Sequence, residues 1–307
     1  MPELSVVVPL YNKAEYVERC ARSIRAQTLT DFEVIVVDDG STDTGLEDFR
    51  RACDGDSRFV FTSQPNGGVS KARNTGIERA RADVVAFLDA DDEWLPGYLA
   101  AIAALARRHP EATLLGTAYR IVQGGSAIHR REGLFDGVSP IDIDGFFAAW
   151  ARLGLCPLFI GATAVRRADL LAIGGFEVGM NLGEELLTFI RLLERGPIVF
   201  HDEPLVVYHL GLTGTLATSP SPTAIRNHVK LISELERQVE RGHCPPSVCR
   251  RWMALHAHYL IQTGQRGDLL RFLVRSPSQF AARQWAAGLL ELTGLRRPLR
   301  WILGRTA

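Results

Sequence analysis

The short acidic segment after residue 88 has the residue types of a cation or phosphate site. Asp89, Asp91 and Asp92 directly follow an unbroken apolar run at residues 84–88. Such a run predicts a strand buried on both faces of a sheet. Because an unpaired buried carboxylate is very costly, these side chains must lie where the strand leaves the sheet. Carboxylates this close repel one another unless a cation shares the site, and Mg2+ or Mn2+ takes such oxygen ligands. The alternative is a solvated acidic turn.

Two further acidic pairs stand where predicted elements begin or end. Asp38 and Asp39 follow another apolar run, so they too are expected at the exit of a strand. Glu184 and Glu185 precede a helical pattern at residues 186–195 and would lie in its first turn, where the helix dipole favours anions. The alternative for this pair is an ordinary N-terminal charge on a helix.

The first 92 residues predict alternating strands and helices. Strands are expected at residues 5–10, 32–37, 59–61 and 84–88, with helices between them at 14–27, 46–53 and 69–82. This order implies a parallel sheet with right-handed crossovers, in which the carboxyl ends of the strands share one edge. Open α/β sheets bind their ligands at that edge.

The remaining chain predicts more strands and then only helices. Strands are expected at residues 113–122, 158–165, 198–200 and 205–208, and helices at 97–108, 146–153 and 186–195. A Ser-Pro-Ser-Pro segment at residues 219–222 is typical of a linker. Helical patterns follow it at residues 224–241, 247–264, 268–274 and 279–293. The sequence therefore predicts an α/β protein with a Rossmann-like, mostly parallel sheet flanked by helices in a domain at residues 1–215, and a C-terminal helical extension at 216–307.

Composition excludes several classes of protein. The 307 residues include 35 basic and 35 acidic side chains, which disfavours a general nucleic-acid binder. The five Cys show no CxxC spacing, so neither a zinc site nor a disulfide framework is indicated, and free thiols suit a reducing cytosol. The chain begins without a basic signal region, and no apolar run approaches the roughly 20 residues that span a bilayer. These features predict a cytoplasmic protein that binds no nucleic acid.

Three common ligand signatures are absent from the sequence. No GxGxxG follows the first predicted strand, and no GxxxxGK[ST] occurs, so neither a dinucleotide fingerprint nor a P-loop is indicated. An EF-hand starting at Asp89 is excluded because its sixth position is Trp94, where that loop needs Gly.

Five motifs, taken in order, resemble those of the inverting nucleotide-sugar glycosyltransferases of family 2, which have the GT-A fold. The resemblance covers about residues 4–210. The matching text is VPLYN at residues 8–12, VDDGSTD at 37–43, NGG at 66–68 with ARNTG at 72–76, LDADD at 88–92, and GGF at 174–176. The resemblance implies a nucleotide-binding half at residues 1–110 and an acceptor half at 111–215, with residues 113–170 shaping the acceptor pocket.

The resemblance also implies a site for the nucleotide-sugar donor. Its expected residues are Pro9, Tyr11, Asn12, Asp38, Asp39, Asn66, Gly68, Arg73, Asp89 and Ala90. Tyr11 is expected to lie against the base, and Asp39 to accept hydrogen bonds from the base or ribose. Arg73 is expected to reach the base or a phosphate oxygen. The alternatives are a packing role for Tyr11 and a surface position for Arg73.

A divalent cation, Mn2+ or Mg2+, is expected beside this donor site. The resemblance implies that Asp91 ligates the metal, while Asp89 faces the ribose or a metal-bound water. Asp92 is expected only to cap the next helix. The family often has Tyr-Arg-x-His after its last core strand, but here Gly211 stands at the His position and His209 lies two residues earlier. His209 is a candidate metal ligand if the loop is shifted. The alternative is a structural histidine.

The resemblance places the general base in the acidic pair that follows the GGF motif. An acceptor hydroxyl needs a base within hydrogen-bond reach when it attacks the anomeric carbon. Glu185 is the expected base and Glu184 the alternate. The family usually has Asp at the second position, so the carboxylate of Glu185 extends one methylene further.

The function implied is that of a metal-dependent, inverting, hexosyltransferase-type enzyme. It would move a sugar from a nucleotide-sugar, expected to be a UDP-sugar, to a hydroxyl of a glycan or lipid-linked acceptor in polysaccharide or glycoconjugate assembly of the cell envelope. One alternative is a catalytically inactive protein that binds a nucleotide-sugar or a protein partner on the same fold. Another is a nucleotidyltransferase, which would release pyrophosphate rather than a nucleoside diphosphate.

The end of the chain is basic and rich in tryptophan. Residues 266–307 contain eight Arg against Asp268 and Glu291, with Trp285 and Trp301 among them. A basic amphipathic helix of this kind can lie on an anionic membrane, so peripheral contact with the inner face of the cell membrane is one hypothesis. The favoured alternative is a helical cap on the catalytic domain or the interface of a homodimer.

Overall fold

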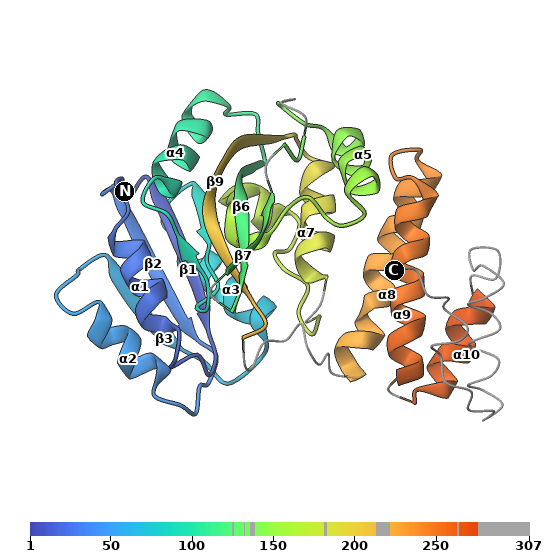
Figure 1. The fold of residues 1–307 in the computed structure, drawn as a ribbon, viewed down its shortest axis with the longest axis horizontal. Coiled ribbons are helices and arrows are strands. Elements are labelled where there is room, and N and C mark those ends of the chain that lie inside the picture. Colours follow the sequence, from blue (N-terminus) through green and yellow to red (C-terminus); the bar gives the residue numbers. More distant parts are fainter. Residues whose placement is uncertain are drawn as a thin grey trace. The chain divides into compact units, whose positions relative to one another are not determined.

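The computed structural model describes residues 1–124, 126–131, 133–135, 139–180, 183–212, 222–262 and 264–275. The chain divides into two compact units, Met1–Ser219 and Pro220–Ala307. The first unit is a sheet flanked by helices, and the described part of the second is helical (Figure 1).

The N-terminal half of the first unit is a parallel sheet. Its strands are β1 (Leu4–Leu10), β2 (Phe32–Asp38), β3 (Phe59–Ser63) and β4 (Val84–Phe87), in the order β3-β2-β1-β4. The connecting helices are α1 (Val17–Arg25), α2 (Gly45–Ala52) and α3 (Val69–Arg79). Every residue of β1, β2 and β4 is buried, as expected of apolar strands covered by helices on both faces. The alternation predicted for residues 1–92 is therefore confirmed.

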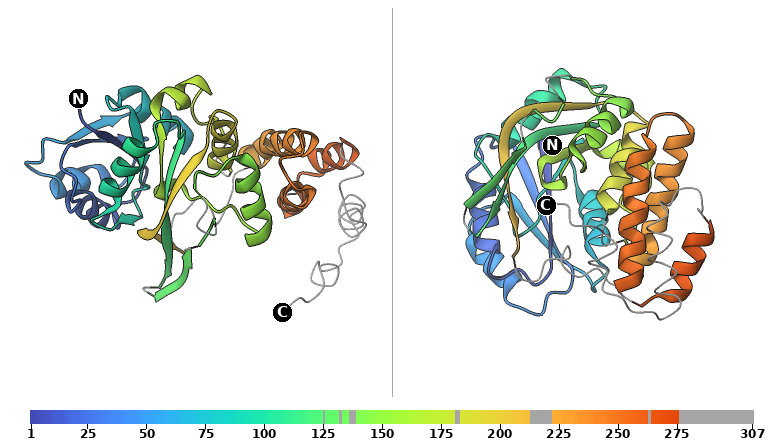
Figure 2. Two further views of the ribbon diagram at one scale, coloured as in Figure 1. Left: turned by 90° about the horizontal axis from the view of Figure 1, so that it is seen from above. Right: turned by 45° about the vertical axis from the view of Figure 1, so that its right-hand side comes forward.

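The second half extends the same sheet with mixed pairing. Strand β8 (Thr163–Arg166) lies antiparallel between β4 and β6 (Leu114–Gln123), and β9 (Ile198–Leu210) pairs parallel with β6. The short β5 (Glu93–Trp94) pairs with β9, and β7 (Ser126–Arg131) forms a hairpin with β6 that projects from the rest of the sheet (Figure 2). Parallel pairing thus predominates in the N-terminal half.

The remaining helices of the first unit flank this part of the sheet. They are α4 (Tyr98–Arg108), α5 (Ile143–Leu153), the 3-10 turn η1 (Ile160–Ala162), α6 (Arg167–Ala172) and α7 (Glu184–Leu193).

Two strand predictions in this half were wrong in detail. The strand expected at residues 158–165 is the η1 turn followed by β8, since Thr163 donates its hydroxyl hydrogen bond back to the Ile160 carbonyl and tightens the turn. The two strands expected at residues 198–200 and 205–208 are one strand, β9. Its polar middle section continues the pairing through register shifts opposite Thr117 and Ala118.

The second unit is described as three helices. These are α8 (Pro222–Glu240), α9 (Pro246–Gln262) and α10 (Arg266–Arg275), close to the helices predicted at residues 224–274. Leu231 and Leu235 of α8 and Met253 and Leu260 of α9 are buried, as expected of packed amphipathic helices. None of the helices among the described residues is both long and apolar enough to cross a bilayer. The helix predicted at residues 279–293 lies outside the described residues.

Candidate active site

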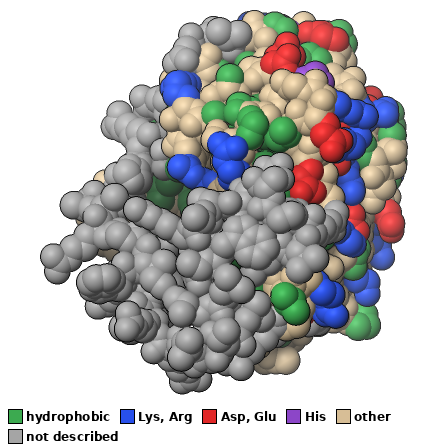
Figure 3. All heavy atoms as spheres, turned by 90° about the vertical axis from the view of Figure 1, so that its right-hand side faces the viewer, with side chains coloured by type: hydrophobic (Ala, Val, Ile, Leu, Met, Phe, Trp, Pro, Cys, Tyr) green, Lys and Arg blue, Asp and Glu red, His purple; other side chains and the backbone are tan. Residues whose placement is uncertain are grey.

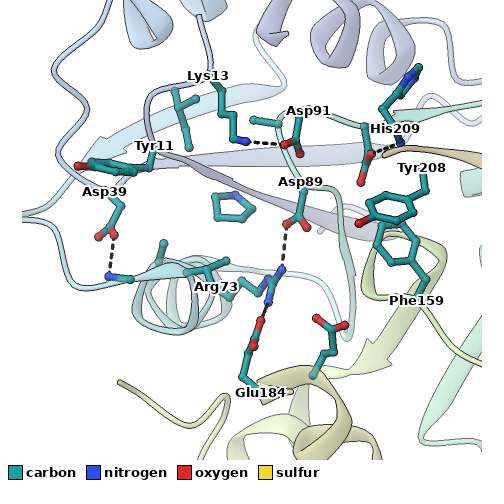
Figure 4. A pocket seen from close by; sticks show the side chains of 18 of the residues that line it. Tyr11, Lys13, Asp39, Arg73, Asp89, Asp91, Phe159, Glu184, Tyr208 and His209 are labelled. Carbon is teal, nitrogen blue, oxygen red and sulfur yellow. Dashed lines mark hydrogen bonds and ion pairs between the residues drawn. The ribbon is translucent and has the colours of Figure 1, made fainter. Parts of the chain in front are cut away.

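A pocket of about 350 Å³ opens at the carboxyl ends of β1, β2 and β4 (Figure 4). Further walls come from α3, from the start of α7 and from the end of β9. Its lining residues are Pro9, Leu10, Tyr11, Lys13, Asp39, Asn66, Gly68, Val69, Ala72, Arg73, Asp89, Ala90, Asp91, Asp92, Phe159, Gly183, Glu184, Glu185, Tyr208 and His209. All of the residues predicted for the site except Asn12 and Asp38 are among them. The position is the ligand edge expected of an open α/β sheet.

Asp39 shapes the loop that leads into α3. Its carboxylate accepts hydrogen bonds from Gln64 Nε2 at 2.7 Å, from the Gly67 amide at 3.0 Å and from the Gly68 amide at 2.8 Å. Gly68 has a φ of 87°, a conformation that favours glycine, and α3 begins at the next residue. Tyr11, 46% exposed, stands on the same side of the pocket as Asp39 (Figure 4). These residues form the wall at which a base and ribose are expected.

Asn12 and Asp38 hold loops together instead of lining the pocket. The Asn12 side-chain carbonyl accepts a hydrogen bond from the Thr42 backbone amide at 2.8 Å, and the Asn12 backbone amide donates to Ser41 Oγ at 3.1 Å. Asp38 is buried and accepts from the Ser41 amide at 3.0 Å. Both residues therefore fasten the loop after β2, and Asn12 ties it to the loop after β1. The donor contact predicted for each stays a prediction.

The guanidinium of Arg73 is buried and pairs with two carboxylates. Its side chain is 2% exposed, and its two terminal nitrogens lie 2.9 Å from Asp89 Oδ1 and 3.0 Å from Glu184 Oε1. Its guanidinium also lies 5.3 Å from the ring centre of Phe176. Burial lowers the pKa of Arg73, but the charges of Asp89, Glu184 and Glu185 outweigh burial and raise that pKa. Arg73 is therefore not a surface arginine: it joins the end of β4 to the start of α7.

The two neighbouring glutamates lie in different surroundings. Glu184 is buried and paired with Arg73, whereas Glu185 is half-buried and lines the pocket. Burial, and then the negative charge of Glu184, raise the pKa of Glu185 to about 8. The pKa of Glu185 thus lies close to neutral pH, as is favourable for a general base.

The acidic segment after β4 is contacted by basic side chains near the N-terminus and by a backbone amide of β9. Asp91 Oδ2 lies 2.5 Å from the ammonium of Lys13, and its backbone carbonyl accepts a hydrogen bond from Arg19. Asp92 is buried, and its Oδ1 accepts from the His209 amide at 2.9 Å. Burial, then the charges of Asp91 and Asp89, raise the pKa of Asp92 well above its usual value. The prediction that Asp92 caps the next helix was wrong, since its carboxyl instead ties this loop to β9 and α4 begins after Gly97 without a side-chain cap.

The imidazole of His209 contacts Glu93 and not the acidic segment after β4. Its Nε2 lies 2.9 Å from Glu93 Oε1, and this hydrogen bond lowers the pKa of Glu93. In Figure 4 the imidazole points away from Asp91. Ligation of a metal by His209 stays a prediction, and it requires the ring to leave Glu93.

The donor atoms near Asp91 fit a hard divalent cation. Asp89 and Asp91 supply carboxylate oxygens, and Asp92 Oδ2 is a buried oxygen with no hydrogen-bond partner among the described residues. Within those residues, no group of three or more His, Cys, Asp or Glu is arranged to hold a metal. Magnesium-type ions are commonly bound through only one or two carboxylates, together with waters and substrate phosphates, so the residues present are sufficient.

Several lining residues were not predicted from the sequence. Lys13 follows Tyr11 and Asn12 directly, so its place in the same loop was a usable signal. Phe159 and Tyr208 form an aromatic wall with ring centres 4.6 Å apart (Figure 4). Both had been assigned to predicted strands, and nothing in the local pattern distinguishes them from core residues.

The ARNTG and GGF motifs meet in the structure. Asn74 Nδ2 donates to the Phe176 carbonyl, and the Phe176 amide donates to Asn74 Oδ1, both at 2.8 Å. A Cβ on Gly175 would lie 2.5 Å from Asn74 Oδ1, and Gly175 has a φ of 73°. Glycine is therefore required there for the loop to approach α3.

Comparison with known proteins gives sequence relatives for the N-terminal part of the chain. The uncharacterized glycosyltransferase EpsJ of Bacillus subtilis is 42% identical over 92 residues, which is 30% of this chain and 27% of that protein. The chondroitin synthase of Pasteurella multocida is 38% identical over 92 residues, covering 30% of this chain and 10% of that protein. The chain thus spans about a quarter or less of the length of these relatives.

Two solved structures share the fold of the chain. TarS 1-349 of S. aureus, in complex with UDP-GlcNAc, superposes with a TM-score of 0.66 and 18% identity over 94% of this chain and 80% of that one. The mannosyltransferase PcManGT of Pyrobaculum calidifontis, in complex with GDP-Man and Mn2+, gives 0.60 and 21% over 98% and 83%. These matches confirm the predicted GT-A fold.

The sequence model of the family "Glycosyl transferase family 2" matches residues 5–172, more than half of the chain. That region contains the donor half of the pocket, including Asp39, Arg73 and the Asp89–Asp91 pair. The chain belongs to glycosyl transferase family 2.

Proposed function

We propose that the protein transfers a sugar from a nucleotide-sugar, of the UDP class, to an acceptor hydroxyl with inversion at the anomeric carbon. The supporting observation is the arrangement of one pocket, which brings Asp39, Arg73, Asp89 and Asp91 together with the partly buried Glu185. A nucleotide wall, a charged centre and a base candidate are the parts that such a transfer needs.

In this proposal the donor lies along the carboxyl ends of β1, β2 and β4. Tyr11 offers an aromatic face to the base, and the loop held by Asp39 binds the base and ribose. Asp91 and Asp89 would hold Mn2+ or Mg2+, which neutralises the charge that grows on the departing nucleoside diphosphate. Arg73 keeps Asp89 in place through its hydrogen bond.

Glu185 is proposed as the general base and Glu184 as a positioning residue. Glu184 is bound to Arg73, and moving it to an acceptor would leave a buried guanidinium short of a partner, which is costly. Glu185 has a raised pKa and faces the pocket, so its carboxylate can accept the proton of the attacking hydroxyl. Attack from the side opposite the leaving group gives inversion.

The acceptor is proposed to be a glycan or a lipid-linked glycan. Phe159 and Tyr208 offer the apolar faces on which a sugar ring packs, and both belong to the acceptor half of the unit. Assembly of an envelope polysaccharide or another glycoconjugate in the cytoplasm is the proposed setting.

The hypotheses for the C-terminal segment stay predictions. Residues 276–307 lie outside the described residues. Flotation with anionic vesicles, comparing the full chain with one lacking residues 266–307, tests membrane contact. Equal flotation of the two proteins would contradict membrane contact through this segment.

Calorimetric titration with UDP, GDP and dTDP, each with and without Mn2+, tests the proposed function. One nucleotide is expected to bind tightly only with Mn2+, and Asp91→Asn should weaken that binding by about tenfold or more, the loss of one charge-assisted contact. Absence of binding by every nucleotide would favour the inactive, partner-binding alternative.

A further inference from the structure

We infer that Lys13 is a donor-site residue that changes partners: its ammonium neutralises Asp91 in the empty pocket and pairs with the donor's diphosphate once a divalent cation occupies Asp91. The inference rests on the proposed function. It assigns a second cationic side chain, beside Arg73, to the binding of nucleotide-sugar phosphates.

The first observation is the enclosure of the pair. Lys13 Nζ lies 2.5 Å from Asp91 Oδ2, and the two side chains are only 14% and 13% exposed. Surface pairs between long side chains contribute little, but this pair lies inside the pocket, where solvent screening is weaker. Figure 4 shows the Lys13 side chain directed at Asp91 from the loop after β1.

The second observation is the balance of charge around the pocket. Its lining includes six acidic side chains and two cationic ones, Lys13 and Arg73. The acidic ones are Asp39, Asp89, Asp91, Asp92, Glu184 and Glu185. Acidic side chains thus outnumber cationic ones three to one, so the lining offers a diphosphate few cationic partners of its own.

The two cationic side chains differ in their freedom to move. Arg73 is held by two carboxylates on separate elements, so its planar fork is fixed. Lys13 ends in a compact ammonium on a flexible four-carbon stem, and its contact with Asp91 is made by one nitrogen. Lys13 is thus the better placed of the two to change partners.

The competition follows from the shared carboxylate. A divalent cation on either oxygen of Asp91 would lie close to the ammonium that contacts Oδ2, and the two positive charges would repel each other strongly. Lys13 must therefore leave Asp91 when the cation binds, and the diphosphate that shares the cation is the nearest new anion. Lysine commonly binds phosphate as a point charge. By linkage, removing Lys13 should strengthen cation binding to the empty protein and weaken diphosphate binding to the cation-loaded protein.

The test uses Lys13→Met, which keeps the length of the stem and removes the charge. The affinity for Mn2+ without nucleotide is determined from the electron paramagnetic resonance signal of the free ion. The affinity for UDP is determined by calorimetry at saturating Mn2+. We expect Lys13→Met to bind Mn2+ about three- to tenfold more tightly and UDP about tenfold less tightly, the scale of one charge-assisted hydrogen bond. Lys13→Arg, which keeps the charge, should retain most of the UDP affinity.

Lys71→Met is the matched control, because Lys71 lies exposed on α3 outside the pocket lining and its loss changes the net charge equally. It should leave both affinities unchanged. Weaker or unchanged Mn2+ binding by Lys13→Met, in a protein whose unaltered thermal unfolding temperature shows that it is folded, would overturn the inference. If the wild type binds GDP or dTDP and not UDP, that nucleotide is used in the calorimetric titrations of all the variants. If the wild type binds none of the three, the proposed function fails, while the Mn2+ arm alone still tests the exchange at Asp91.

Discussion

At the scale of single residues, Glu184 and Glu185 show that two identical side chains acquire different properties from their positions alone. The first is buried against Arg73, and the second faces the pocket with a pKa raised to about 8. The sequence placed both at the start of one helix, but no local pattern tells which of the two turns inward. That choice depends on Arg73, which comes from a distant helix and is fixed only by the folded sheet.

Replacing Glu185 by Gln tests its role as base. General-base catalysis contributes about 10²- to 10⁴-fold, so release of nucleoside diphosphate from the donor should fall by that factor while donor affinity stays the same. Steady-state rates and calorimetric binding of the same preparations measure the two effects. Glu194→Gln, at the exposed far end of the same helix, is the control and should keep the wild-type rate. Unchanged turnover in Glu185→Gln would return the assignment to Glu184.

The pH dependence of turnover follows from the direction of the Glu185 shift. A base works in its deprotonated form, and a pKa of about 8 leaves Glu185 mostly protonated at pH 7. The rate of the wild type should therefore rise as the pH increases from 7 to 9 and level off above the pKa. A rate that is flat over this range, measured at saturating donor and Mn2+, would contradict the assignment.

At the scale of elements, Arg73 connects α3 with the end of β4 and the start of α7. Removing one partner of a buried ion pair costs about 3–5 kcal/mol, because the other charge stays buried and unpaired. Arg73→Met should therefore lower the free energy of unfolding by about that amount, since Glu184 is 4% exposed. The double variant Arg73→Met/Glu184→Gln should recover part of the loss. Urea unfolding measures both, and no recovery in the double variant would show that the loss comes from packing alone.

The close approach of α3 to β1 gives a second prediction for elements. A Cβ on Gly76 would lie 2.3 Å from Val7 Cγ1, inside the core. Gly76→Ala should destabilise the protein by about 1–3 kcal/mol, the cost of overpacking, although Ala is the better helix former. Gly267→Ala in α10, where a Cβ meets nothing within 4 Å, is the contrasting case and should be neutral or slightly stabilising. Equal stability of the two variants in urea unfolding would contradict this packing.

The elements also show what sequence patterns can predict. Strands β1, β2 and β4 were predicted because parallel strands covered on both faces are apolar throughout. The two-residue β5 and the hairpin strand β7 were missed, since neither is long or apolar enough to show a regular spacing of apolar residues. For the site, the acidic residues were found because charge at the end of an apolar run is conspicuous. Phe159 and Tyr208 were missed because tertiary contacts alone bring them to the pocket, whereas the place of Lys13 beside Tyr11 and Asn12 was a signal that went unused.

At the scale of the whole molecule, the pocket belongs to one of the two units. Every described residue that lines the pocket lies within Met1–Ser219. On the face in Figure 3, basic and acidic side chains of the described residues alternate, in keeping with the 35 charges of each sign. The described residues on that face form no continuous patch of one sign.

A chain ending at residue 219 should therefore bind nucleotide as the full chain does. Because the described residues that line the pocket all lie within Met1–Ser219, the dissociation constants should agree within about twofold. Calorimetry with Mn2+ and the nucleotide identified for the full chain measures this, and circular dichroism checks that the shortened chain is folded. A folded short chain with an affinity tenfold lower would show that the helical unit contributes to the pocket.

The adjacent Arg73 and Asn74 have a consequence for how this kind of enzyme diversifies. Together they fasten Glu184 and the Phe176 loop to α3, the same helix whose N-terminal loop is held by Asp39. The spacing between the proposed donor site and the proposed base is therefore fixed as one block. The segment between β6 and β8 contributes none of these bonds, so we expect that substitutions in it can alter the acceptor pocket without moving the donor site. Relatives that use other acceptors are then expected to differ chiefly in that segment.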